Sequence, residues 1–437
     1  MIIHMGIDDT DSPKGGCTTH LGYTIVKQIW NDVEFLDYPN LIRLNPNIPY
    51  RTRGNGAVAL RFITKNPDRI KEKIIHIFDT YYDKNYKNTN PGLVFVENNI
   101  PEQIKWFSRK ALEEVIPVKL ARNLIERLNL EYYGYGKMRG LIGGLSAIGN
   151  QLKGDYTYEL ITYRDIKEHD RVRNVDFNSV VKIDKKYHNY IFANIDYKTH
   201  TLLITPHGPD PVIYGIRGED PEILVNAMHE IISTPPISSW MIFRSNQGTG
   251  EHLKKIKPIT EARPYRPHIA EGIIKATPRI IEGGHVNFLL EDNTGTIECM
   301  AYEPSGDFRK IIMQLTKNDF VRIYGGIKPA SSNHPITLNV ERLDILYLAK
   351  KYKYQNPICP KCGKRLKSAG SNKGYKCKNC GFRIKEIQKI KVPIERNVKV
   401  GIYIPPPRAQ RHLTRPIERL SRNNESVLVK IIEKWFE

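Results

Sequence analysis

Cysteine is scarce in this sequence, with six in 437 residues. A number so small in a chain of this length excludes a secreted scaffold held together by disulfides. The sequence also lacks any apolar run of 18 residues, so no transmembrane helix is expected. Its first residues lack the basic and then apolar layout of a signal peptide. These absences together predict a cytoplasmic protein that has no membrane partner.

Acidic residues are scarce in the last fifth of the chain. Residues 351–437 hold 22 Lys and Arg against 6 Asp and Glu, a net charge of +16. Residues 1–350 hold 45 and 41, a net charge of +4. A mild excess of basic residues would indicate only a solvated surface. An excess of this density is the electrostatic footprint of a nucleic-acid binder, so we expect a nucleic acid as partner.

The length predicts several domains, because single hydrophobic cores stop growing near ~250–300 residues. Residues 1–130 alternate strand-like and helix-like segments, which is typical of an α/β or α+β domain. Among them, the spacing predicts a helix over 67–81 that starts at Pro67. The glycine-rich segment 134–149 is interpreted as a boundary or as a second ligand-facing loop. Residues 131–260 mix strands with few helices and predict a compact α+β domain.

Residues 261–350 have the pattern of an all-β domain. Five strand-like runs are separated by turn signals, and a short helical stretch at 307–315 lies between the third and fourth runs. This order is that of an OB-fold, a barrel that commonly binds single-stranded oligonucleotides. Another small barrel is the alternative. The runs are 269–274, 285–290, 296–302, 320–327 and 337–348.

Four of the six cysteines form two Cys-x-x-Cys pairs, Cys359 with Cys362 and Cys377 with Cys380. Two such pairs separated by 14 residues predict a closed, structural Zn²⁺ site made of four thiolates. The alternative, four unrelated thiols, requires the spacing to be accidental. The site defines a cation-rich zinc ribbon over residues 351–395. A basic C-terminal tail, 396–437, follows, with a helix expected near 427–436.

The first loop holds the strongest candidates for catalysis. Asp8, Asp9 and Asp11 directly follow the apolar run Ile2–Ile7, and carboxylates are ligands that Mg²⁺ prefers. Thr18 offers a hydroxyl that could bind or receive a phosphate. Two alternatives stay open: a turn whose acids bond local N–H groups, and a phosphatase loop with a carboxylate nucleophile. We expect the loop to be a metal–nucleotide site with these four residues at its catalytic centre.

The residues around these carboxylates suit a phosphate. Gly15 and Gly16 let backbone N–H groups approach an anion because no Cβ is in the way, and Lys14 adds a positive charge. Arg51 and Arg53 lie in a second loop rich in proline and glycine, where guanidinium forks could clamp phosphate. The alternative for this second loop is an ordinary turn with solvated arginines. We expect these five residues to bind the nucleotide.

Seven motifs, in chain order, resemble one family. They are GIDDTDSPKGGCTTHLG, LIRLNPNIPYRTRGNGAVAL, TNPGLVFV, RGLIGGLSAIG, VIYGIRGE, IEGGHV and NPICPKCGKR…SAG…GYKCKNC. Together they resemble the archaeal TiaS family, the tRNA(Ile) 2-agmatinylcytidine synthetases, over nearly the whole chain. The resemblance implies a multidomain α+β protein with four parts. They are a kinase-like α/β domain (1–130), a ferredoxin-like α+β domain (131–260), the OB-fold and the zinc ribbon.

The resemblance also implies a reaction. The family uses ATP to attach agmatine to C2 of the wobble cytidine in the CAU anticodon of an isoleucine tRNA. ATP is cleaved to AMP, its γ-phosphate activates the C2 oxygen, and agmatine then displaces phosphate. The implied cofactors are ATP, Mg²⁺ and structural Zn²⁺. Thr18 matches the family's autophosphorylated threonine, and Asp8, Asp9 and Asp11 match its acidic loop.

Two rival functions stay open on the residues alone. A non-catalytic nucleic-acid binder leaves the chemistry of the first loop unexplained, and a small-molecule phosphatase or kinase leaves the basic tail unexplained. For the synthetase, agmatine needs a pocket lined by acids or carbonyls. We expect that pocket where the first two domains meet, near the loops 134–149 and 214–219.

Overall fold

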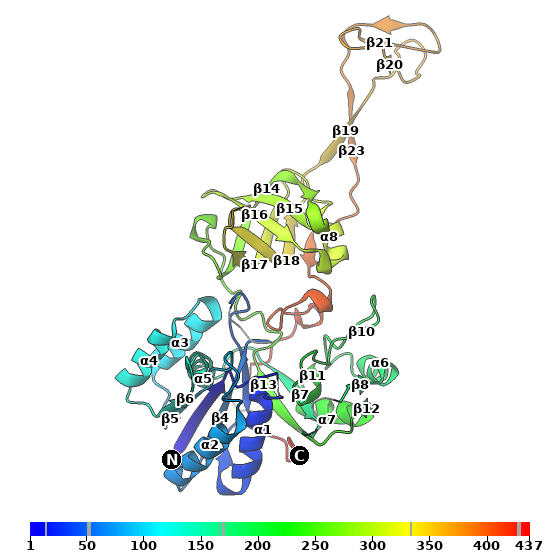
Figure 1. Ribbon diagram of the computed structural model, residues 1–437. Helices are drawn as coiled ribbons and strands as arrows, with labels where there is room; N and C mark the ends of the chain where they lie inside the picture. The colour runs from blue at the N-terminus through cyan, green and yellow to red at the C-terminus, as the bar shows by residue number, and fades with distance from the viewer. Residues whose placement is uncertain (14, 50–53, 166, 168–170, 333, 426–429) are drawn as a thin grey trace.

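The computed structural model describes the whole chain except residues 14, 50–53, 166, 168–170, 333 and 426–429. Three bodies follow one another along its length (Figure 1). A large α/β body holds both ends of the chain, a β-barrel lies above it, and a small cysteine-rich ribbon stands at the far end of a two-stranded arm. The protein is therefore a multidomain α+β protein, as the sequence predicts.

The large body is built on one nine-stranded sheet. Its strands follow the order β11-β7-β13-β3-β4-β1-β5-β6, and β2 pairs with β4 off this path. All neighbours are antiparallel except β13 and β3, which are parallel. The strands are β1 (Ile2–Asp8), β2 (Glu34–Phe35), β3 (Asn40–Arg43), β4 (Gly56–Ile63), β5 (Gly92–Glu97), β6 (Tyr132–Gly134), β7 (Thr157–Tyr163), β11 (Val212–Gly218) and β13 (Ser239–Ser245).

The sheet crosses the boundary that the sequence suggests near residue 130. The β13–β3 pairing joins the first and second parts of the chain into one sheet, with Arg244 opposite Asn40. Beyond residue 130, β6 still pairs with β5 of the first part. The division of this body at 130 therefore stays a prediction.

Helices cover both faces of the first half of the sheet. Val58 faces α1 and lies opposite Ile7 in β4–β1, whereas Gly6, the neighbour of Ile7, faces α5, so the two helices lie on opposite faces. The helix predicted over 67–81 is α2, with Pro67 in its first turn. No helix in the described part of the chain combines the length and apolarity needed to cross a bilayer. The helices of this half are α1 (Thr18–Ile29), α2 (Pro67–Tyr81), α3 (Glu102–Glu113), α4 (Val118–Arg127) and α5 (Gly140–Gly149).

The glycine-rich segment 134–149, expected to be a loop or a boundary, is mostly the buried helix α5. Its glycines serve packing and not flexibility. A Cβ on Gly6 of β1 would lie 2.0 Å from the carbonyl oxygen of Gly144, and one on Gly92 of β5 would lie 2.1 Å from the amide nitrogen of Leu141. The helix backbone thus rests directly on the sheet, which no larger residue permits.

The second half of the sheet is accompanied by two helices and two small two-stranded sheets. Helices α6 (Phe177–Lys186) and α7 (Pro221–Glu230) are capped by Asp176 and Asp220, whose carboxylates accept backbone N–H bonds of the first turn. Between α6 and β11 lies the short antiparallel pair β9 (Ile195–Asp196) and β10 (Thr201–Leu202). The second small pair is β8 (Asn174–Val175) and β12 (Ser233–Thr234).

The barrel confirms the expected five strands, with helix α8 (Asp307–Ile312) between the third and the fourth. A parallel β16–β18 pairing closes it, and its interior is a separate hydrophobic core around Phe288 and Ile323. The strands are β14 (Pro267–Ile280), β15 (Val286–Glu291), β16 (Thr296–Ala301), β17 (Phe320–Lys328) and β18 (Thr337–Tyr347).

The ribbon is joined to the barrel by a long antiparallel arm, β19 (Lys351–Gln355) and β23 (Ile390–Ile394). Its own sheet is small, formed by β20 (Lys367–Ser368), β21 (Tyr375–Lys376) and β22 (Arg383–Ile384). The four cysteines form its core together with Leu366. A domain this small needs a metal or disulfides to be stable.

The segment after the ribbon returns to the large body instead of ending as a free tail. It adds β24 (Gly401–Tyr403) to the barrel edge at β18 and then runs between barrel and body (Figure 1). Its last residues lie along β13, where the Ile242 N–H donates to the Trp435 carbonyl at 2.9 Å and the Trp435 ring is buried. The helix expected near 427–436 is absent from residues 430–437, and residues 426–429 lie outside the described part.

We predict that Gly6→Ala destabilises the protein by about 3 kcal/mol or more, because the added methyl overlaps helix backbone that cannot move aside. Gly154→Ala is the matched control, since a Cβ there meets nothing within 4 Å. Urea unfolding monitored by circular dichroism measures both. Equal midpoints for the two variants would contradict the packing described for α5.

Candidate active site

The carboxylates of the first loop lie where β1 ends. Asp8 is the last residue of the strand, and Asp9 adopts a left-handed backbone conformation with φ of 59°. This turn lets the Asp9 backbone N–H donate to the Asp8 carboxylate at 2.7 Å. Two acids are thus held side by side, one from the strand and one from the turn.

An arginine that sequence reasoning missed completes this pair. Arg139, directly before α5, binds the Asp9 carboxylate with two N–H donors, at 2.9 and 3.1 Å. It lies 130 residues away along the chain. The only signal for it was its place at the start of the RGLIGG motif. The fork geometry fixes the orientation of the Asp9 carboxylate.

The pair keeps excess negative charge in a buried place. Burial raises the pKa of Asp8 well above its ordinary value, and the neighbouring Asp9 carboxylate raises it further. Burial also raises the pKa of Asp9 to about 6, against the opposing effect of Arg139. In the described part of the chain, Arg139 is the only cation paired with these two acids. A buried carboxylate pair with one counter-charge suits a divalent cation, so the residues fit the expected Mg²⁺.

The remaining loop residues are organised around the start of α1. The Thr18 hydroxyl lies 3.0 Å from that of Thr10, and the Thr18 backbone N–H donates to the Asp11 carboxylate at 3.3 Å. The hydroxyl of Thr89, which lies shortly before β5, donates to the Asp11 carbonyl at 2.6 Å and so fixes the first loop. Asp11 therefore caps the α1 N-terminus beside Thr18, while Asp8 and Asp9 form the acidic pair.

The two glycines of this loop shape its backbone. Gly15 has a φ of 102°, which L side chains rarely adopt, and its N–H donates to the Ser12 carbonyl. A Cβ on Gly16 would lie 2.7 Å from the Thr10 carbonyl oxygen. Lys14, Arg51 and Arg53, the other expected nucleotide-binding residues, lie outside the described residues.

A cavity of about 350 Å³ opens beside the acidic pair. Asp8, Asp9 and Arg139 lie on one side, and the turn between α3 and α4 on the other. Asp11 and Thr18 do not line it. The loop expected at 214–219 contributes nothing here, because it lies mostly in β11, and its Arg217 lines a different cavity. The apolar part of the wall is made by Leu44, Ile48, Ala111, Val115, Ile116, Pro117, Val118 and Ile142.

The four expected zinc ligands converge in the ribbon. All four sulfur atoms lie within 4.8 Å of one another, with Cys362 and Cys377 3.4 Å apart and Cys359 and Cys380 3.6 Å apart. Four thiolates around Zn²⁺, each about 2.3 Å from the ion, require separations of this size. Gly363 and Gly381, after each pair, have φ of 71°. The chemistry and spacing fit Zn²⁺ with no ligand position left open.

Four family models match successive parts of the chain. They are the TiaS TCKD domain at residues 4–137, the TiaS FLD domain at 138–252, an OB-fold nucleic acid binding domain at 270–346, and the TiaS C-terminal zinc ribbon domain at 356–398. The sequence is also similar to the tRNA(Ile2) 2-agmatinylcytidine synthetase TiaS of Staphylothermus marinus. It is 41% identical over 432 residues, which cover 96% of this chain and 94% of the relative.

Solved structures resemble the whole fold. A crystal structure of a TiaS–tRNA(Ile2)–ATP complex matches with a TM-score of 0.86 and 35% identity, covering 99% of both chains. A TiaS–tRNA(Ile2)–AMPCPP–agmatine complex matches with a TM-score of 0.83 and 32% identity, covering 98% of this chain and 100% of the other. The similarity therefore includes the arrangement of all four parts.

We predict that Arg139→Gln destabilises the protein by roughly 1–3 kcal/mol, because it leaves the buried Asp9 carboxylate without its donors. Adding Asp9→Asn to this variant is expected to recover most of the loss, since the unpaired charge is then removed. Urea unfolding of the wild type, both single variants and the double variant measures the coupling. Costs that simply add would show that the two side chains do not interact.

Proposed function

This chain belongs to the TiaS family, the tRNA(Ile2) 2-agmatinylcytidine synthetases, and we propose that its chemistry takes place at the Asp8–Asp9 pair. The protein is an ATP-dependent, tRNA-modifying ligase with tRNA(Ile2) and agmatine as its substrates. The observation that supports our placement is the pair of acids at the edge of a cavity, with Asp9 buried, Asp8 half-buried and Arg139 as the one cation paired with them among the described residues. Mg²⁺ that accompanies ATP would balance the charge of these two carboxylates.

The reaction needs an activated base. The oxygen at C2 of cytosine is a poor leaving group, and transfer of the ATP γ-phosphate to that oxygen turns it into a good one. The agmatine amine then attacks C2, and phosphate departs with the oxygen. Mg²⁺ held by Asp8 and Asp9 would supply neutralisation of phosphate charge. Arg139 orients Asp9 for this role and carries a further positive charge at the cavity wall.

Thr18 lies in a position that suits a phosphate acceptor. It is the first residue of α1, where the helix N-terminus favours an anion, and its hydroxyl contacts that of Thr10. In the present arrangement Thr18 is buried, so transfer to it requires the loop to open. We propose that it receives phosphate from ATP, as its position in the motif implies.

Agmatine fits the cavity of about 350 Å³ better than any arginine-lined site. The apolar walls at Ile48, Ile116 and Val118 suit its methylene chain, and a further acid that lines the cavity, Glu114, can attract its guanidinium. We therefore propose that agmatine binds at the junction near 134–149, beside Lys137 and Gly143, and not at 214–219.

The tRNA is held by elements far from this cavity. A base stacked in an anticodon loop cannot react, so it must be drawn out, and single-stranded loops are what an OB-fold engages. The barrel, the ribbon and the basic residues of 351–437 offer a surface for the RNA backbone. We propose that these parts bind the tRNA while the wobble cytidine of its CAU anticodon reacts beside the acidic pair.

Two finer features of the fold belong to this proposal. The second part runs β7, α6, a short β9–β10 hairpin, β11, α7 and β13, which is the alternation of a ferredoxin-like domain. The first part, with its strand-to-loop nucleotide site, would be the kinase-like domain that binds ATP and transfers its γ-phosphate.

We predict that Asp8→Asn and Asp9→Asn each lower the rate of 2-agmatinylcytidine formation by at least about 10²-fold, because the charge that holds the metal is lost. The assay incubates protein, unmodified tRNA(Ile2), Mg²⁺, ATP and agmatine, followed by nucleoside mass spectrometry. Asp68→Asn, an exposed acid in the first turn of α2, is the control and keeps wild-type activity. Full activity in Asp8→Asn would remove the acidic pair from the mechanism.

We predict that Thr18→Val abolishes ATP-dependent phosphorylation of the protein, whereas Thr18→Ser retains it, because only the hydroxyl is needed. Incubation with ATP labelled at the γ-phosphate, in the absence of tRNA, followed by peptide mapping, measures the label. Thr24→Val is the control, since Thr24 lies one turn and a half further along α1 and its hydroxyl bonds the His20 carbonyl. Label remaining in Thr18→Val would assign the acceptor elsewhere.

A further inference from the structure

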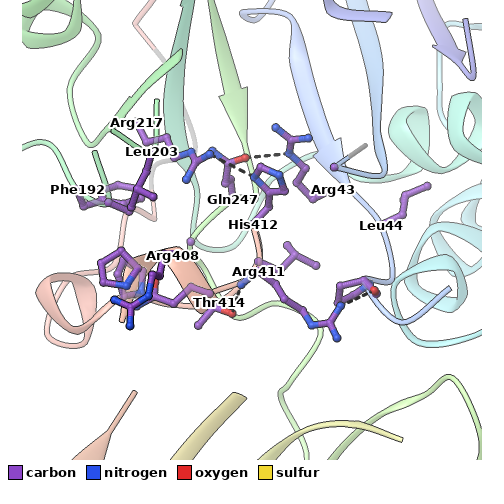
Figure 2. Close-up of a pocket in the computed structure, with 18 residues that line it drawn as sticks. Arg43, Leu44, Phe192, Leu203, Arg217, Gln247, Arg408, Arg411, His412 and Thr414 are labelled. Carbon is purple, nitrogen blue, oxygen red and sulfur yellow. Dashed lines mark hydrogen bonds between the residues drawn. The ribbon is translucent and has the colours of Figure 1, made fainter. Parts of the chain in front are cut away.

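A second cavity, of about 300 Å³, lies where three segments distant in the sequence meet (Figure 2). The first is the end of β3 and the turn after it, with Arg43 and Leu44. The second comes from the other half of the sheet, with Arg217 of β11. The third is the C-terminal segment 407–416, with Arg408 and Arg411. Leu44 also lines the cavity beside Asp8 and Asp9, so the two cavities are neighbours.

The four arginines of this cavity differ in how their charge is balanced. Arg408 binds Asp196 and Arg411 binds Glu341, and both carboxylates are buried. Arg43 and Arg217 instead share one carboxylate, Glu159, at 3.2 and 3.5 Å.

The Arg43–Glu159–Arg217 cluster is shielded from water. The three side chains are 12%, 6% and 19% exposed. Burial lowers the pKa of Arg43, and Arg217 lowers it further while Glu159 opposes both effects. Neither guanidinium loses its charge at neutral pH. Among the described residues, the cluster therefore holds one positive charge more than its single carboxylate balances.

The buried side-chain amide of Gln247 also lines this cavity. Gln247 is 1% exposed, and its Oε1 accepts the Arg43 Nε–H at 2.8 Å. Because a guanidinium can only donate, this bond fixes the amide with its Nε2 turned the other way. That nitrogen has no hydrogen-bond partner among the described residues. A buried donor without an acceptor costs about 1–3 kcal/mol, so the site calls for an acceptor.

We propose that this cavity binds the phosphate group of a nucleotide, held by Arg43, Arg217 and the Gln247 amide. The oxyanion supplies both the negative charge and the acceptor that the cavity lacks. Phe192 and Leu203 give the cavity an apolar side against which the sugar or base of the same nucleotide can rest. The excess positive charge excludes agmatine from it. The inference extends the proposed function, in which RNA reaches the neighbouring acidic pair, and names RNA or free ATP as sources of the phosphate.

A change of a single atom in one side chain tests the site. Gln247→Glu keeps the acceptor for Arg43 and places a carboxylate where the phosphate would bind. We expect this variant to have a higher melting temperature than the wild type and to lose its response to inorganic phosphate. Wild-type protein is expected to gain melting temperature as phosphate replaces chloride at constant ionic strength. A lower melting temperature in Gln247→Glu, or a wild type indifferent to phosphate, overturns the proposal.

A second variant identifies the source of the phosphate. Arg217→Met leaves Arg43 and Glu159 as a neutral pair. If the phosphate belongs to RNA, we expect affinity for tRNA(Ile2) without ATP or agmatine to fall about tenfold, and the slope of log affinity against log salt to fall by about one. Arg69→Met, an exposed arginine on α2 at the end of the body away from the ribbon, is the control and changes neither.

If the phosphate belongs to free ATP, Arg217→Met weakens ATP binding about tenfold and leaves the tRNA affinity and its salt slope unchanged. No change in either measurement overturns the site. These are binding measurements on a protein that need not turn over. A failure of the proposed catalytic role of Asp8 and Asp9 therefore shows in the nucleoside assay alone and leaves this test unaffected.

Discussion

The close contact between α5 and the sheet is the constraint on which the catalytic region depends. A Cβ on Gly140 would lie 2.3 Å from the Asp8 carbonyl oxygen, and one on Gly143 would lie 1.9 Å from the Asp8 Oδ2. The helix therefore starts directly on the residue where β1 ends. This contact brings Arg139, just before the helix, within bonding distance of Asp9. Any side chain on these glycines would lift the helix and take Arg139 away from the acid that it orients.

The same contact explains why the acidic pair can exist at all. Two carboxylates in a buried place repel each other, and desolvation disfavours their charged forms. One arginine offsets part of this cost, and the rest is left for a ligand to relieve. The second cavity repeats the arrangement with opposite sign, since two guanidiniums there share Glu159. Two neighbouring cavities of opposite charge excess suit a reaction that brings together metal, a cationic amine and phosphates.

The parts of this structure that were predictable from sequence depend on local spacing. Helix α2 follows from Pro67 and its apolar period, the barrel from five runs with a helix after the third, and the metal cluster from two Cys-x-x-Cys pairs. Arg139 was not predictable, because its pairing with Asp9 is created by packing across 130 residues. The segment 134–149 was misjudged for a related reason. Taken from the sequence alone, glycine indicates a turn. The glycine-rich helix α5 is favourable only because its backbone packs directly against the sheet.

The return of the C-terminal segment to the large body was also not predictable from local sequence patterns. Arg419, with no exposed surface, binds the carboxylates of Asp155 and Glu219, and a buried cation of this kind cannot leave without stranding both acids. Further along, Trp435 is buried beneath β13. Between the barrel and these two anchors, the same segment contributes Arg408, Arg411 and His412 to the lining of the second cavity. The segment is thus attached to the barrel at β24 and to the large body at Arg419, and the residues that line the cavity lie between these two attachments. Some basic residues of the C-terminal region therefore line an inner cavity and do not only add charge to the surface.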